Sequence, residues 1–221
     1  MCEVVSNLLK IKDSLSKPCT VVAVSKTKPI EDIQQAYNSG HRDFAENKVQ
    51  ELTEKADLLP KDIRWHFIGH LQRNKVKYIV PFIHLIHGVD SPRLLNEINK
   101  RAKNENKIIQ CLLQVHIAEE DTKFGFNKPE LLDMIQQDNF KELENVLIMG
   151  LMGMATYTTD QHQIRREFRS LKNLFEELRE LDNKFKMKTL SMGMSGDYQI
   201  ALEEGSNMIR IGSAIFGERN H

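Results

Sequence analysis

The stretch that decides the fold is TVVAVS at residues 20–25. Its side chains are β-branched or small, and polar and apolar positions do not alternate within it, which is typical of a strand covered on both faces. Lys26 follows directly, and a helical pattern then begins with Pro29 at its first position and stops at Ser39 and Gly40. A buried strand followed by an amphipathic helix is the repeating unit of an α/β protein.

The same unit recurs along the rest of the chain. Seven further strand-like runs follow, at residues 42–47, 64–69, 84–90, 107–117, 147–154, 189–195 and 208–213. Amphipathic helical patterns separate them, and the strongest places apolar residues on one stripe at Ile164, Phe168, Leu171, Leu174, Phe175, Leu178 and Leu181. With a helix ahead of the first strand, this order predicts an α/β fold, a single-domain (β/α)8 TIM barrel with an extra N-terminal helix. A doubly wound open sheet is the alternative, although no Gly-x-Gly-x-x-Gly motif follows the first strand.

Composition narrows the kinds of partner that the protein can have. The 31 Lys and Arg residues balance 31 Asp and Glu, whereas a general nucleic-acid binder carries a basic excess. No apolar run approaches the ~20 residues that span a bilayer, and the N-terminus lacks a signal-peptide core. The three cysteines form no ligand or disulfide pattern, which is typical of reduced thiols. We therefore expect a cytoplasmic protein, one domain over residues 1–221, that binds a small molecule and neither nucleic acid nor membrane.

The first strand delivers a lysine to the end of the barrel where function is expected. In such barrels the functional side chains lie at the C-terminal ends of the strands, and Lys26 ends the first strand. A free lysine has a pKa near ~10.4 and is almost wholly protonated at neutral pH. Imine formation with a carbonyl compound therefore needs a lowered pKa, from partial burial or from a neighbouring cation such as Lys28. A lysine at a strand end is otherwise commonly a solvated surface group.

The last two predicted strands end in residues that suit an anion. Ser195 closes the seventh strand, and Gly212 and Ser213 follow Arg210 at the eighth. Adjacent N–H groups and a hydroxyl can cradle a phosphate, while a guanidinium supplies fixed positive charge. Phosphate is commonly held after strands seven and eight of such a barrel. An imine-forming lysine opposite a phosphate cradle suits a phosphorylated aldehyde, and pyridoxal 5'-phosphate (PLP) is the cofactor of that shape.

Two more polar residues fall where they can face a ring in the barrel mouth. Asn47 ends the second strand and His66 lies within the third, although buried residues of both types also serve commonly as structural groups. His66 and His70 have the spacing of a helical metal pair, but Gly69 and the strand pattern place them off a single helical face. We predict no metal site.

Five blocks of the sequence resemble the pyridoxal phosphate homeostasis proteins, the YggS/PROSC-type family. They are VAVSKTKP at 22–29, FAENKVQE at 44–51, WHFIGHLQRNK at 65–75, LSMGMSGD at 190–197 and IRIGSAIFG at 209–217. The resemblance implies a fold-type III PLP-binding barrel like the N-terminal domain of alanine racemase, with PLP held as a Schiff base on Lys26. It further implies that Ser195, Arg210, Gly212 and Ser213 border the phosphate end of the cofactor, with Asn47 and His66 near its ring.

The chain departs from this family pattern at two places. Residues 150–156 read GLMGMAT where many members have a Gly-Leu-Met-x-Ile-Pro stretch, and Lys123-Phe124-Gly125 replaces a Lys-Ser-Gly seen in some relatives. We assign no functional role to the loop that leaves the sixth strand.

Chain length favours a carrier over an enzyme. Racemases of this fold type add a β-rich second domain that supplies an acid/base tyrosine, and 221 residues leave no room for one. Racemisation needs a second base besides Lys26, and Tyr157 is the best remaining candidate. We expect a PLP carrier in intracellular vitamin B6 homeostasis, a monomer, with PLP-dependent apo-enzymes as possible recipients. The alternatives are a PLP-dependent enzyme with weak amino-acid racemase-like activity and an aldolase-type barrel that uses Lys26 on a sugar phosphate.

Overall fold

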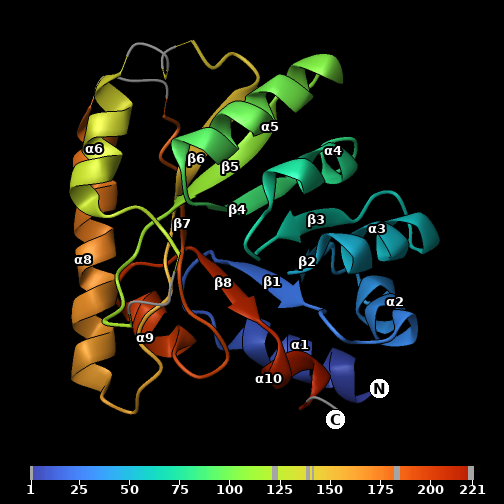
Figure 1. Ribbon diagram of the computed structural model, residues 1–221. Helices are drawn as coiled ribbons and strands as arrows, with labels where there is room; N and C mark the ends of the chain where they lie inside the picture. Colours follow the sequence, from blue (N-terminus) through green and yellow to red (C-terminus); the bar gives the residue numbers. More distant parts are fainter. Residues whose placement is uncertain (1, 121–123, 138–139, 141, 182–184, 219–221) are drawn as a thin grey trace.

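The strand-like runs of the sequence form eight parallel strands that close into a barrel (Figure 1). The structure is a computed structural model that describes residues 2–120, 124–137, 140, 142–181 and 185–218. The strands are β1 Thr20–Val24, β2 Asp43–Glu46, β3 Arg64–Phe67, β4 Leu85–Val89, β5 Ile109–Gln114, β6 Val146–Met152, β7 Thr189–Ser191 and β8 Met208–Ile211. Each pairs with the next along the chain, and β1 pairs with β8, which confirms the predicted barrel and excludes the open sheet.

The helices lie outside the barrel (Figure 1). They are α1 Glu3–Asp13, α2 Ile30–Asn38, α3 Val49–Leu58, a 3₁₀ turn η1 Arg73–Lys75, α4 Val76–Ile79, α5 Pro92–Asn104, α6 Lys128–Gln136, α8 Gln161–Glu180, α9 Tyr198–Glu203 and α10 Ser213–Phe216. The extra helix α1 packs beside α10, where Asn7 Nδ2 donates to the carbonyl of Ile215 (3.3 Å). Within the described ranges, no helix combines the length and apolar character needed to cross a membrane.

Local sequence signals set the helix ends. Ser91 Oγ accepts a hydrogen bond from the N–H of Leu94 and Pro92 occupies the first turn, as predicted for α5. Pro29, predicted at the first position of α2, is instead the N-cap residue, with extended backbone angles. Leu181, the last residue of the predicted stripe on α8, lies past the helix end and is 44% exposed.

Alternating side chains divide the core into two regions. Successive residues of a strand point to opposite faces, so Val21 and Ala23 pack against the helices while Val22 and Val24 belong to the smaller cluster inside the barrel. Arg210 pairs in register with Val22, which places its side chain on the inward face of β8. The barrel interior therefore contains buried polar side chains as well as apolar ones.

The C-terminal ends of the strands form the mouth of the barrel, and β7 stops early there. Gly193 follows it with a φ of +98°, and a Cβ at that position would lie 2.6 Å from Cβ of Ala201. Only glycine fits this turn. Ser195, predicted to close the seventh strand, consequently lies in the loop between β7 and α9.

Candidate functional site

The strand ends surround a cavity of about 630 Å³ at the C-terminal mouth of the barrel. Six of the seven residues singled out in the sequence line it: Lys26, Asn47, Ser195, Arg210, Gly212 and Ser213. They lie on the inward face or just past the ends of β1, β2, β7 and β8. Residues far apart in the chain thus meet because parallel strands deliver their C-terminal ends to one edge.

Lys26 is half-buried, and both of its neighbours in the chain are held by acidic side chains. Ser25 Oγ donates to Glu46 Oε1 (2.6 Å), and the N–H of Thr27 donates to Glu51 Oε1 (2.6 Å). Thr27 has a φ of +64°, a left-handed conformation that is costly for a β-branched residue. These hydrogen bonds stabilise the strained turn, and so they fix the point from which the Lys26 side chain starts.

A buried lysine, Lys55 of α3, joins these acidic groups. Its Nζ donates to Glu46 Oε1 (2.8 Å), to Glu51 Oε1 (2.7 Å) and to the carbonyl of Ser25 (2.8 Å). The Glu46 side chain is fully buried, and this burial raises the pKa of its carboxyl, against the opposing effect of the Lys55 ammonium. Lys55 was not anticipated from the sequence, where it reads as an ordinary helix-surface residue.

The opposite side of the cavity gathers hydrogen-bonding groups at the start of α10. Ser195 Oγ lies within 3.3 Å of the Gly212 amide nitrogen and 3.4 Å of that of Ala214, and accepts from both N–H groups. The loop that carries Ser195 is held by the N–H of Met194, which donates to Asp197 Oδ1 (2.6 Å). One hydroxyl and two amides thus lie together at one end of the cavity.

Arg210 lines the cavity from the barrel interior and is only 3% exposed. Its Nη1 donates to Ser191 Oγ (2.7 Å) and its Nη2 donates to the carbonyl of Gly153 (3.0 Å). Burial lowers the pKa of the guanidinium to about 10, with a smaller opposing effect from Asp197. Arg210 therefore remains a cation at neutral pH.

Asn47 lies on another wall, close to the end of β3. A Cβ added to Gly69 would lie 2.2 Å from the carbonyl oxygen of Asn47, so the backbone approach requires glycine there. Gln114 and His70 also line this part of the cavity, and neither was singled out as a ligand residue in the sequence. Gln114 is the last residue of β5, whereas the strand-like run of the sequence continues to residue 117, so the sequence did not mark it as a strand-end residue.

His66 does not line the cavity. It is buried in the barrel interior, in contact with Asp43 and His87, and Ile68, two residues further along the chain, lines the cavity instead. Tyr157 lies at the rim and is 97% exposed. Within the described residues, no group of three or more His, Cys, Asp and Glu side chains could hold a metal ion.

Residues 150–156, where the chain departs from the family pattern, are tied to α8. The N–H of Thr156 donates to Glu167 Oε2 (2.7 Å), and its hydroxyl donates to Glu167 Oε1 (2.7 Å). These two bonds hold the loop that leaves β6. Lys123, in the second departure, lies outside the described residues.

The fold and the cavity together define a class: (β/α)8 barrels with a lysine, a buried arginine and a hydroxyl–amide cluster around the C-terminal mouth. The family model described as "Alanine racemase, N-terminal domain" matches residues 3–220. A pyridoxal phosphate homeostasis protein from Aquifex aeolicus is 40% identical over 202 residues, which cover 91% of this chain and 87% of the relative. The chain belongs to the pyridoxal phosphate homeostasis protein family.

Solved structures agree with this assignment. PipY from Synechococcus elongatus, determined without PLP and with PLP bound, superposes with TM-scores of 0.91 and 0.88 at 31% identity, covering 97% of this chain and all of PipY. An alanine racemase from Clostridium difficile gives a TM-score of 0.79 at 16% identity, covering 98% of this chain and 56% of the racemase. The likeness to the racemase is one of fold alone.

Proposed function

We propose that this protein binds PLP in the cavity at the C-terminal mouth, as a Schiff base on Lys26, and serves intracellular vitamin B6 homeostasis as a carrier. The observation that carries the proposal is the meeting of Lys26 with Ser195, Gly212 and Ser213 around one cavity. Family membership and the PipY structure with PLP bound give it independent support.

The chemistry of the donor set fits this cofactor. When bound, PLP supplies an aldehyde carbon that an amine can attack and a phosphate that needs hydrogen-bond donors. Lys26 is the amine, and the hydroxyls of Ser195 and Ser213 are the donors. The Gly212 amide, which donates to Ser195 Oγ over 3.3 Å in this structure, would exchange that acceptor for the phosphate. The Arg210 guanidinium adds a desolvated positive charge at the cavity, while Asn47 borders its other wall.

A carrier role is favoured over an enzyme role by the groups that remain for proton transfer. Besides Lys26 and Arg210, the titratable side chains Lys28, His70 and Tyr157 line the cavity. Lys28 Nζ donates to the carbonyl of Glu218 (2.7 Å). The His70 side chain is 44% exposed and its Nδ1 lies 2.8 Å from Asp90 Oδ2, while Tyr157 is 97% exposed. General acid–base catalysis depends on positioned groups, and protection of reactive intermediates on the exclusion of water. We propose a monomeric cytoplasmic carrier that releases PLP to apo-enzymes.

The covalent assignment is tested by borohydride reduction of the PLP-loaded protein, followed by peptide mass analysis. The phosphopyridoxyl mass is expected on the peptide that contains Lys26, and the variant Lys26→Ala should lose it. Lys28→Ala is the matched control, because Lys28 also lines the cavity, and it should keep the label. A label on any other lysine would overturn the assignment.

The carrier role is tested by incubating the loaded protein with single amino acids and following their chirality by chromatography. The absorption spectrum of the bound PLP is expected to change in proportion to the amount of protein, while the amino acid keeps its chirality. Steady racemisation over many turnovers would overturn the carrier role and establish the enzyme alternative.

A further inference from the structure

A continuous line of buried polar side chains crosses the barrel interior beneath the cavity. Arg210 Nη1 lies 2.7 Å from Ser191 Oγ, which lies 3.1 Å from His87 Nδ1. His87 Nε2 lies 2.9 Å from His66 Nδ1, and His66 Nε2 lies 3.1 Å from Asp43 Oδ1. The five residues come from β8, β7, β4, β3 and β2, and each is less than 9% exposed.

We propose that Ser191, His87, His66 and Asp43 are positioning residues that form a one-directional hydrogen-bond relay and fix the guanidinium of Arg210 at the cavity. The relay as such concerns the protein alone. Its consequence for cofactor affinity rests on the proposed function.

The two ends of the line decide its direction. A guanidinium only donates and a carboxylate only accepts. Ser191 Oγ accepts from Arg210, so its own hydrogen is directed to His87 Nδ1. A neutral His87 then carries its proton on Nε2 and donates to His66 Nδ1, and His66 in turn donates from Nε2 to the carboxylate of Asp43. The reverse arrangement would place the lone pair of His66 Nε2 against the carboxylate.

Burial keeps both imidazoles neutral, as this arrangement requires. Desolvation lowers the pKa of His66 and lowers that of His87 well below its ordinary value. For His66 the nearby Asp43 carboxylate opposes the shift, and for His87 the Arg210 guanidinium adds to it. Each ring can therefore donate one hydrogen bond and accept one, as the relay needs.

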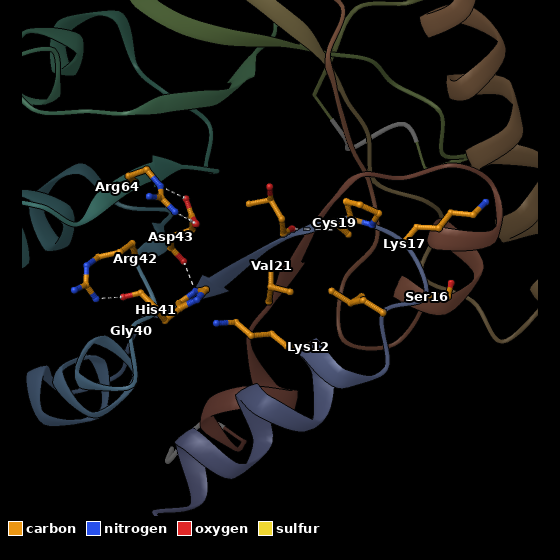
Figure 2. A pocket seen from close by; sticks show the side chains of 13 residues that line it. Lys12, Ser16, Lys17, Cys19, Val21, Gly40, His41, Arg42, Asp43 and Arg64 are labelled. Atoms are coloured by element: carbon orange, nitrogen blue, oxygen red, sulfur yellow. Dashed lines mark hydrogen bonds and ion pairs between the residues drawn. The ribbon is translucent and has the colours of Figure 1, made fainter.

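The relay is anchored at the opposite end of the barrel. Arg64 holds Asp43 through two bonds, Nε to Oδ1 (2.8 Å) and Nη2 to Oδ2 (2.5 Å), as Figure 2 shows. Both residues line a second cavity of about 630 Å³ at that end. These bonds hold the Asp43 carboxylate in place, and the series of hydrogen bonds that ends on it is therefore fixed as far as Arg210.

The relay gives Ser191 a role that a merely structural serine does not have. Without its hydroxyl, Arg210 loses one of the two acceptors described above, the remaining one being the carbonyl of Gly153. A hydrogen bond to a charged group is among the stronger ones in proteins, so misplacement of the guanidinium is expected to weaken PLP binding about 10- to 100-fold. Ser206 is the matched control, since its buried hydroxyl donates to the carbonyl of Met192 (2.7 Å) outside the relay.

Two measurements test the proposal. In the PLP-free protein labelled with ¹⁵N-histidine, NMR at pH 7 should show His66 and His87 as neutral rings protonated on Nε2. A proton on Nδ1 of either ring, or a charged ring, would overturn the relay. This reading does not depend on whether Lys26 binds PLP.

In fluorescence titrations with PLP, Ser191→Ala should weaken binding 10- to 100-fold and change the His87 ring signals. Ser191→Thr, which keeps the hydroxyl, should restore most of the affinity, and Ser206→Ala should change neither readout. Unchanged affinity in Ser191→Ala refutes the positioning role. Absence of PLP binding in the unmodified protein would refute the proposed function instead, and the NMR result would still decide the relay.

Discussion

The variant Lys55→Met isolates the buried charge cluster beneath the Lys26 turn. Lys55 is 6% exposed and its Nζ donates three hydrogen bonds, two of them to Glu46 and Glu51. Removing one partner of a buried ion pair costs about 3–5 kcal/mol, because the other charge is left uncompensated. We expect a loss near the lower end of that range, since the Glu46 carboxyl can take up a proton.

Because the Glu46 carboxyl can take up a proton, the stability lost in Lys55→Met depends on pH. Without the Lys55 ammonium, the pKa of Glu46 in the folded state lies further above its unfolded value, because burial already raises it. A carboxyl of this kind contributes stability below the unfolded pKa and loses it as the pH rises through the folded pKa. The deficit of Lys55→Met should therefore be smaller at pH 5 than at pH 8.

The assay is the free energy of unfolding in urea at both pH values. At pH 8, Lys55→Met should lose about 3 kcal/mol, and the double variant Glu46→Gln/Lys55→Met should recover part of that loss. Lys103→Met, on the exposed face of α5, is the matched control and should stay within about 0.5 kcal/mol of the unmodified protein. Additive losses in the double variant, or a deficit independent of pH, would refute the reasoning.

Two further predictions concern stability. Burial, aided by the Lys12 ammonium, lowers the pKa of His41 to about 4, so the unfolded state binds more protons than the folded state below pH ~6.5. The free energy of unfolding should therefore fall by on the order of 3 kcal/mol between pH 6.5 and pH 4 because of His41. His41→Phe should make urea unfolding less dependent on pH in this range, and an unchanged dependence would contradict the prediction. Gly69→Ala places a Cβ 2.2 Å from the Asn47 carbonyl oxygen, whereas the Cβ of Gly196→Ala meets nothing within 4 Å. Gly69→Ala should therefore lower Tm by several degrees, and Gly196→Ala should leave it unchanged. Equal Tm values for the two variants would contradict the close approach.

The sequence predicted the strands and the grouping of residues at the mouth, because uninterrupted apolar runs mark buried strands and parallel strands end together. The sequence did not show that His66 lies in the barrel interior and not at the cavity. A strand covered on both faces lacks the alternation that tells which side chains point inward, and the level of a residue within the barrel depends on the register with Ala45 and Leu85. Lys55 was missed because two of its three acceptors, Ser25 and Glu46, lie outside its own helix, at the ends of β1 and β2.

The line from Arg210 to Asp43 constrains how this barrel can be redesigned. A partly satisfied polar network is less favourable than an apolar core, so the five residues form a unit that can be exchanged only as a whole. An engineer who changes the chemistry of the mouth by replacing Arg210 must also redesign the interior as far as Arg64, which holds Asp43 at the far end. Sequence variation at these positions should accordingly be correlated, although they lie on five different strands between residues 43 and 210.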